Sequence, residues 1–221
     1  MKRQSRNRLE IVLSALREKY DGVPEVAYER LLGFADAIKK WSVRTQLVSN
    51  RDISVLVDRH IVESLGAPFV FDFKEVQSIV DLGSGAGLPG IPLSIVFPQK
   101  SFSLVEPMRK RVLFLKHIVR VLSLKNVTVL HGRMEHFEFV DPGCVVVARA
   151  VASLSELIEW SVASVQDEFA LLAMKGGDLK EELDDAQRSW PGFGFEIVKY
   201  PEAVSSQSAD KKLVVVQKKA E

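Results

Sequence analysis

The sequence predicts a doubly wound α/β fold, with a mostly parallel seven-stranded sheet, a C-terminal antiparallel hairpin and an N-terminal helical cap. Apolar residues fall at helical spacing up to about residue 70, and beyond that point short apolar runs alternate with amphipathic helical patterns. Runs that are apolar on both faces and joined by helices are typical of a parallel sheet covered on both sides. We therefore divide the 221 residues into a helical cap, residues 1–70, and an α/β domain, residues 71–221.

The cap contains three helical patterns, and a turn at residues 21–24 precedes the second. The positions that share a face in the successive patterns are Leu9, Val12, Leu13 and Leu16, then Leu31, Phe34, Ala35 and Ile38, then Leu56, His60, Ile61 and Ser64. Because His60 lies among apolar positions, we expect it to be a core histidine with its ring nitrogens satisfied.

Seven short runs predict the strands of the sheet. In order they are SIVDL, SFSLVEP, NVTVLHG, CVVVARA, FALLAMKGG, GFEIVKY and KLVVVQKK. Helical patterns such as MRKRVLFLKHIVRVL and LSELIEWSVASVQ separate most of the first five runs, which predicts parallel strands. The last two runs have no helix between them, so we expect an antiparallel hairpin that completes the sheet.

Composition excludes several classes of site. The formal net charge is +1, so a nucleic-acid surface must come from local clusters of basic residues. The single cysteine, Cys144, excludes a disulfide framework within the chain and a zinc site of four thiolates, and we expect no metal. No run of about 18 apolar residues exists, so we expect no membrane partner, and the cysteine usage suits the reducing cytoplasm.

The segment GAGLPG, residues 85–90, lies between the first expected strand and a helix. Its letters fit the glycine pattern of dinucleotide-binding folds, and a tight turn without a ligand is the plain alternative. Asp81 comes directly before this loop, where a carboxylate would repel a pyrophosphate and attract a cationic ligand. S-adenosylmethionine has no phosphate and carries an ammonium and a sulfonium group, so it fits these constraints better than a dinucleotide.

Two further strand ends favour the same cofactor. Glu106 ends the second strand, where its carboxylate can accept hydrogen bonds from both ribose hydroxyls, although a solvated acid is the alternative. Met134 and Glu135 follow the third strand, where they can meet the adenine. In open α/β sheets ligands bind beyond the carboxyl ends of the strands, which is where these residues are expected.

The stretch DLGSGAGLPGIPLSIVFP is similar to the nucleotide-binding motif of the class I methyltransferases, which have a Rossmann-like sheet. The longer GLPGIPLSI, with DRHIVESL, RKRVLFL, GRME, ARAVASL and AMKGG, resembles the bacterial 16S ribosomal RNA guanine-N7 methyltransferases, once called glucose-inhibited division protein B. This resemblance covers most of the chain. It implies methyl transfer from S-adenosylmethionine to guanine N7 in 16S ribosomal RNA or the small ribosomal subunit, in the cytoplasm.

The residues assigned to the cofactor site, from the motifs and the resemblance together, are Gly83, Gly85, Leu88, Glu106, Met134, Glu135 and Arg149. Arg149 is expected to face both cofactor and substrate from the end of the fourth strand. The chain has QLVS at residues 46–49, and Glu63 and Ser64 after the histidine, where the family usually shows Asn-Leu-Thr and Asp-Ser. These departures leave the roles of the polar cap residues open.

Motifs that are absent from the sequence narrow the choice of the atom that is methylated. The [D/N]-P-P-[Y/F/W] loop that usually serves exocyclic amino groups is replaced by ARAVAS. Methylation at pyrimidine carbon 5 needs a thiolate, and Cys144 begins the fourth strand, at the wrong end of the sheet. Guanine N7 already carries a lone pair, so no proton has to be removed. We therefore assign no catalytic residue and give Arg149 a positioning role.

Basic residues gather after the second strand, because no acidic residue occurs between Pro107 and Met134. We expect the RNA substrate to be bound by Arg109, Lys110, Arg111, Arg133 and Lys175. A second basic cluster comprises Lys2, Arg3, Arg6 and Arg8. A solvated helix face is the alternative interpretation of the first cluster.

Three other functions compete with the leading interpretation. The first is a methyltransferase acting on a small molecule or a protein. The second is a nicotinamide-dependent oxidoreductase, which cofactor binding would distinguish. The third is a non-catalytic RNA-binding assembly factor, which methyl transfer to RNA would distinguish.

Overall fold

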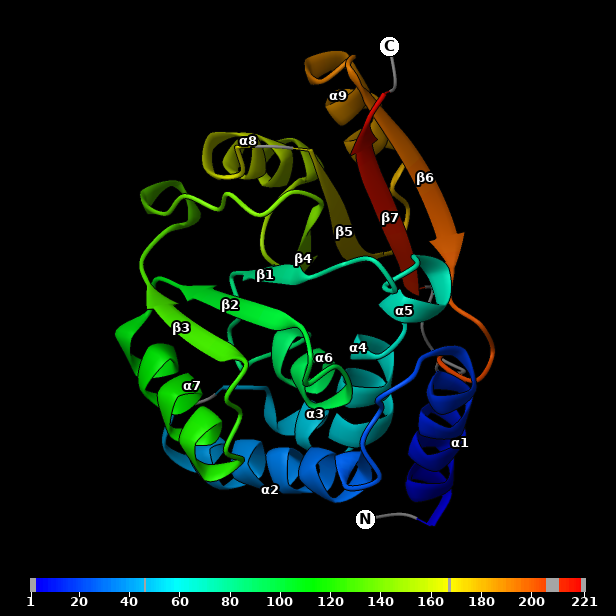
Figure 1. Cartoon of the computed structure of the whole chain (residues 1–221), viewed down its shortest axis with the longest axis vertical. Helices are drawn as coiled ribbons and strands as arrows, with labels where there is room; N and C mark the ends of the chain where they lie inside the picture. The colour runs from blue at the N-terminus through cyan, green and yellow to red at the C-terminus, as the bar shows by residue number, and fades with distance from the viewer. Residues whose placement is uncertain (1–2, 46, 167, 206–210, 220–221) are drawn as a thin grey trace.

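The computed structural model describes residues 3–45, 47–166, 168–205 and 211–219, and it contains a seven-stranded sheet with helices on both faces (Figure 1). The strands are β1 (Ser78–Leu82), β2 (Ser101–Glu106), β3 (Val127–His131), β4 (Cys144–Arg149), β5 (Phe169–Gly176), β6 (Phe193–Lys199) and β7 (Lys211–Lys218). Their spatial order is β3-β2-β1-β4-β5-β7-β6. Strands β1 to β5 are parallel, and β7 pairs antiparallel with both β5 and β6. The predicted fold class is confirmed.

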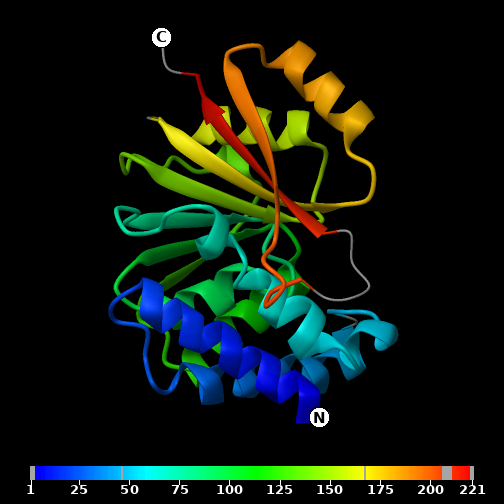
Figure 2. The same ribbon diagram turned by 90° about the vertical axis from the view of Figure 1, so that its right-hand side faces the viewer.

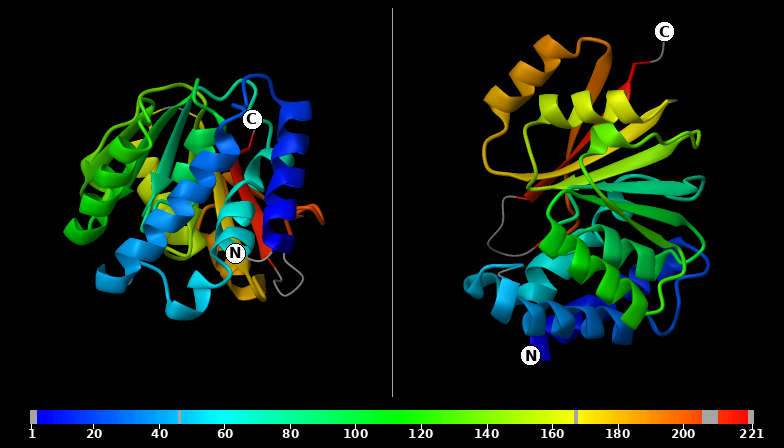
Figure 3. Two further views of the ribbon diagram at one scale, coloured as in Figure 1. Left: turned by 90° about the horizontal axis from the view of Figure 1, so that it is seen from below. Right: turned by 90° about the vertical axis from the view of Figure 1, so that its left-hand side faces the viewer.

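Helices cover the two faces of the sheet unequally. Those before the sheet are α1 (Arg3–Lys19), α2 (Ala27–Thr45), α3 (Asn50–Ile53), the π-helix η1 (Leu56–Ile61), α4 (Val62–Ser64) and α5 (Ala67–Val70). Those within it are α6 (Gly90–Val96), α7 (Arg109–Val121), the 3-10 turn η2 (Met134–His136), α8 (Leu154–Ser164) and α9 (Lys180–Ser189). The cap helices lie with α6 and α7 on one face, and α8 and α9 cover the other (Figures 2 and 3).

The cap and the sheet share one hydrophobic core. Leu9 of α1 and Leu31 of α2 belong to the same buried cluster as Ile79 of β1 and Leu172 of β5. Burial of such side chains stabilises the fold by about 1.5–3 kcal/mol each. The helical segment is therefore packed against one face of the sheet in a common core, and a second hydrophobic cluster lies on the other face. Within the described residues, no helix is both long enough and apolar enough to cross a membrane.

The third expected cap helix is not continuous. It is divided into α3, the π-helix η1 and α4, and π-helical turns are rare and often found at functional sites. The His60 carbonyl accepts hydrogen bonds from Ser64 Oγ at 2.5 Å and from Arg149 Nη1 at 3.1 Å. The spacing of apolar residues carries no sign of these side-chain donors, which is why it predicts a regular helix.

Arg8 connects α1 to the chain between β6 and β7. Its guanidinium donates to the carbonyls of Ala203 at 3.1 Å and Val204 at 2.6 Å. Arg8 belongs to the second basic cluster, and here its guanidinium is engaged by two backbone carbonyls. Of the rest of that cluster, Lys2 lies outside the described residues. Gln46 of the QLVS segment also lies outside them.

The close packing of Gly66 predicts a test of this arrangement. A Cβ on Gly66 would lie 2.5 Å from Cε1 of Tyr200 and 2.8 Å from Cγ1 of Val204, so Gly66→Ala should destabilise the fold by roughly 1–3 kcal/mol. Gly33 in α2 is the matched control, because its Cβ would meet only Leu122 Cδ2 at 3.7 Å. Gly33→Ala should stabilise the fold by about 0.5–1 kcal/mol through helix propensity. Chemical denaturation measures both, and equal effects would contradict the packing argument.

Candidate active site

Parallel register brings several polar strand ends to one edge of the sheet. Leu82 of β1 is level with Val105 of β2 and Ala148 of β4, so Glu106 and Arg149 follow on its two sides. Two cavities open at this edge. The first cavity has a volume of about 250 Å³ and is lined by Leu82, Gly83, Val105, Glu106, Pro107, Met108, Arg111, Gly132, Arg133, Met134, Glu135, Ala150, Val151 and Trp160.

Glu106 is the fixed acid of the first cavity. Its side chain is 1% exposed, and its two carboxylate oxygens accept backbone N–H groups from Gly85 and Met108, each at 2.8 Å. Arg111 Nη1 lies 3.8 Å from Glu106 Oε2. Because each carboxylate oxygen can accept more than one hydrogen bond, Glu106 stays able to bind ligand hydroxyls in a defined orientation.

The glycine loop shapes the first cavity through its backbone. Gly83 lines the cavity with φ of 70°, a left-handed conformation that favours glycine, and a Cβ there would lie 2.8 Å from Val151. Gly85 and Leu88, both assigned to the cofactor site, are not among the residues that line the cavity. Gly85 acts through its N–H, which orients Glu106, and Leu88 is buried in the hydrophobic core.

Asp81 does not line the first cavity, which corrects the expectation that it faces a cationic ligand. Its side chain is fully buried, and Oδ2 accepts the Gly90 N–H at 3.0 Å. Burial raises the pKa of Asp81 to about 7, against the lowering effect of the Gly90 hydrogen bond. The loop has folded over this carboxylate, so Asp81 holds the loop and gives no argument for the charge of the ligand.

The residues after the third strand, β3, lie in the wall of the first cavity. Met134 is buried and Glu135 exposed, and both line the first cavity with Arg133. Of the residues assigned to RNA, Arg111 also lines this cavity, whereas Arg109 and Lys110 are exposed at the start of α7 outside it. The basic group therefore divides between a cavity wall and an outer surface.

A second cavity, of about 200 Å³, lies between the cap and the sheet edge. Its lining residues are Asp52, Arg59, His60, Glu63, Arg149, Ala150, Met174, Lys175, Tyr200 and Lys211. Ala150 lines both cavities, and its φ of 54° is left-handed, which is uncommon for a residue other than glycine. The loop after β4 is thus the boundary between the two cavities.

Arg149 lines the second cavity and not the first, so its assignment to the cofactor site stays a prediction. Its guanidinium contacts His60, both at the carbonyl and at ring Nδ1. Burial, then the Arg149 charge, lowers the pKa of His60 to about 4, so the ring is neutral at pH 7. A neutral ring that accepts at Nδ1 carries its proton on Nε2, which lies 3.3 Å from Asp52 Oδ1 without good hydrogen-bond geometry.

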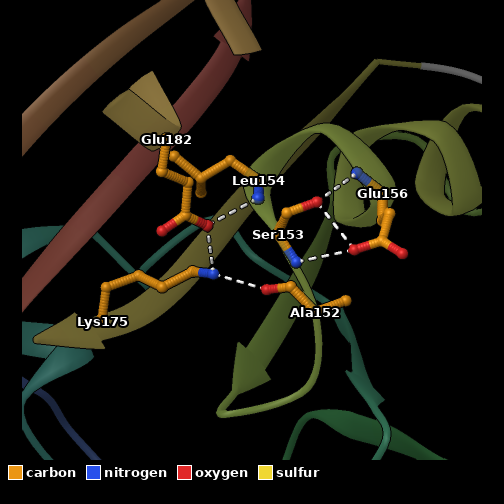
Figure 4. A network of polar contacts seen from close by, with 6 residues as sticks. All are labelled: Ala152, Ser153, Leu154, Glu156, Lys175 and Glu182. Carbon is orange, nitrogen blue, oxygen red and sulfur yellow. Dashed lines mark hydrogen bonds and ion pairs between the residues drawn. The ribbon is translucent and has the colours of Figure 1, made fainter. Parts of the chain in front are cut away.

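Lys175 also lines the second cavity, but its ammonium is held by the protein (Figure 4). Nζ donates to the Ala152 carbonyl at 2.5 Å and pairs with Glu182 Oε1 at 2.6 Å. The same Glu182 oxygen accepts the Leu154 N–H at 2.8 Å. Lys175 therefore fixes the loop that separates the cavities, a role that its strand-end position alone does not reveal.

Two buried residues of the second cavity were missed as site residues by sequence analysis. Glu63 is 3% exposed and Tyr200 is 7% exposed, and their charge states influence that of Arg149. Glu63 was noted only as a departure from the family pattern. No sequence pattern around Tyr200 marks it as a site residue. It follows the edge strand β6, and it lines the cavity only because the folded chain brings residues distant in sequence together.

The raised pKa of Asp81 predicts the pH dependence of stability. Folding favours protonated Asp81, so its contribution is complete below about pH 4 and is lost as pH rises through about 7. Asp81→Asn keeps an acceptor for Gly90 and cannot ionise, so between pH 4 and pH 8 it should gain roughly 2–4 kcal/mol relative to the native protein. Denaturation at several pH values measures this gain. Asp178→Asn, at an exposed acid that also accepts a backbone N–H, is the control, and an equal gain there would contradict the assignment.

Comparison with known proteins places the chain in a family. Residues 27–213 match the family model described as GidB, rRNA small subunit methyltransferase G. A protein named ribosomal RNA small subunit methyltransferase G from Vibrio campbellii is 34% identical over 94% of this chain and 99% of its own. One of the same name from Oceanobacillus iheyensis is 32% identical over 93% of this chain and 88% of its own.

Solved structures share the fold at lower identity. A mutant of MtNAS in complex with S-adenosylmethionine has a TM-score of 0.59 and 18% identity, covering 93% of this chain and 77% of that one. A SAM-dependent methyltransferase from Aquifex aeolicus has a TM-score of 0.53 and 15% identity, covering 80% of this chain and 97% of that one. These structures support the fold alone, whereas the family match and the relatives are decisive: the chain belongs to the rRNA small subunit methyltransferase G family.

Proposed function

We propose that this protein transfers a methyl group from S-adenosylmethionine to N7 of a guanine in the 16S ribosomal RNA of the small ribosomal subunit. One observation carries the proposal beyond family membership: two cavities meet at Ala150, on the loop after β4. The first cavity has the features of a cofactor site, and the second has the polar walls that a nucleobase needs. The two cavities therefore share a wall, and we expect the methyl donor and the base to approach each other there.

The first cavity fits the cofactor. Its walls are apolar at Leu82, Val105 and Trp160, which suits a flat adenine, and its fixed acid Glu106 suits two neighbouring ribose hydroxyls. Met134 and Glu135 line the same cavity and would lie beside the adenine. S-adenosylmethionine supplies, when bound, a methyl group activated by its sulfonium.

The second cavity suits a target that needs no base. Guanine N7 is an acceptor with a free lone pair, so the protein has only to position it. His60 is neutral, its Nδ1 is engaged with Arg149, and its Nε2 lies 3.3 Å from Asp52 Oδ1. Cys144 is buried at the opposite end of β4, where burial raises the pKa of its thiol to about 11, so it offers no thiolate nucleophile.

The RNA backbone would meet the protein at the start of α7. Arg109 and Lys110 are exposed there and directly follow Met108, which lines the first cavity. Cations in the first turn of a helix oppose the helix dipole, and α7 has no acidic residue in its first turn to offset them. Phosphate contact supplies a reason for that arrangement, because both the dipole and the side chains attract an anion.

Glu106 provides a test of the cofactor site. Glu106→Gln removes the charge and one acceptor, so S-adenosylmethionine should bind about 10–100-fold more weakly, as expected for charge-assisted hydrogen bonds. Isothermal titration calorimetry measures the change. Glu138→Gln, at an exposed residue outside the cavity, is the control and should bind normally. Equal losses in both variants would remove Glu106 from the site.

The target atom is tested with a modified base. The radiolabelled methyl group is first mapped on small-subunit RNA, and the methylated guanine is then replaced by 7-deazaguanine, which has C–H in place of N7. Methylation should stop, while RNA affinity should change by less than about threefold, because one acceptor among many contacts is lost. Label on the 7-deaza substrate, on an exocyclic amine or on a carbon would overturn the proposal.

A further inference from the structure

The second cavity contains a polar group that has no partner. The Tyr200 hydroxyl is buried and, within the part of the chain that the structure describes, has no hydrogen-bond partner. Leaving a buried donor unsatisfied costs about 1–3 kcal/mol, so proteins rarely do so without a reason. Tyr200 lines the cavity beside Glu63 and Arg149, and a bound molecule that accepts its hydrogen would remove the cost.

Tyr200 is held in this place from two sides. Its ring packs against Gly66, where a Cβ would come within 2.5 Å of the ring. The residues that follow it are fixed by Arg8, which binds the carbonyls of Ala203 and Val204. The Tyr200 ring is therefore packed on one side and the backbone after it is anchored, and a group whose position is fixed can distinguish one ligand from another.

The chemistry of the cavity makes this hydroxyl a donor. Burial, then the nearby Glu63, raises the pKa of Tyr200, so the phenol stays protonated. The cations Arg149 and Lys175 are occupied by His60 and by Ala152 with Glu182. Tyr200 is thus a neutral hydrogen-bond donor beside two cations, Arg149 and Lys175, whose hydrogen bonds go to other groups of the protein.

We propose that Tyr200 is a specificity-determining residue whose hydroxyl donates a hydrogen bond to O6 of the target guanine; this inference rests on the proposed function. N7 and O6 are neighbouring acceptors on one edge of guanine. With N7 directed past Ala150 toward the first cavity, O6 lies on the wall of the second cavity and requires a donor. The adjoining Watson–Crick edge, which shares O6, carries N–H donors, and the acids Asp52 and Glu63 of the same cavity suit such donors.

The experiment compares two RNAs in single-turnover methylation. One carries the mapped target guanine, and the other carries 6-thioguanine there, which keeps N7 and replaces O6 by sulfur, a weak acceptor. Tyr200→Phe should lower the rate on guanine RNA about 10–100-fold, the effect of an unpaired hydrogen-bonding group. On 6-thioguanine RNA the same substitution should cost less than about threefold, because the bond is already weakened. Affinities of both RNAs for protein loaded with S-adenosylhomocysteine give the comparison without turnover.

Tyr20→Phe is the matched control. The Tyr20 hydroxyl is also buried, but it donates to the Pro68 carbonyl at 2.7 Å, and Tyr20 does not line the cavity. This substitution should lower thermal stability and leave the ratio of rates on the two RNAs unchanged. A loss of equal size on both RNAs with Tyr200→Phe, or no loss on either, would overturn the inference. Failure of the native protein to label guanine N7 would instead overturn the proposed function, before any variant is compared.

Discussion

The parallel pairing of β1 with both β2 and β4 is the constraint from which both cavities follow. The chain runs from β1 to β2 and β3 on one side and returns to β4 on the other, so the connections after β1 and β4 diverge. Ligand sites form at such a reversal of strand order because the loops there leave a crevice. Glu106 ends β2 and lines the first cavity, whereas Arg149 ends β4 and lines the second. Ala150 lines both cavities and marks the boundary between them.

The sequence predicts those features of the structure that depend on local patterns of residues. The seven apolar runs match the strands closely, because apolar residues on both faces are a local record of burial between helices. Glu106, Met134 and Glu135 line the first cavity because strand ends in a parallel sheet share one edge. Arg149 shows the limit of prediction from local patterns. Its position at a strand end is local, but its direction is set by His60, which is 89 residues away in the chain.

The loop after β1 shows a second limit. An acid before a glycine loop is visible in sequence, but whether the loop exposes or covers the acid depends on its path. Here the chain closes over Asp81, because Gly90 lacks a side chain: a Cβ there would lie 2.5 Å from Asp81 Oδ2. The glycines of this loop thus have two different roles. Gly83 forms part of the wall of the first cavity, and Gly90 allows the backbone to approach the Asp81 carboxylate closely. The sequence alone does not tell these two roles apart, and only the folded structure does.

The distribution of charge fits a reaction that leaves the base cationic. Methylation at N7 places a positive charge on the guanine, and a free cation nearby would oppose it. In the second cavity, Arg149 is bound to His60, and Lys175 is paired with Glu182. The acids Asp52 and Glu63 line the same cavity, and carboxylates there favour a developing positive charge. The internal contacts of Arg149 and Lys175 fix the cap and the boundary loop, so these two cations are not free to oppose a positively charged base, and Arg59 and Lys211 are the other cations of the cavity wall.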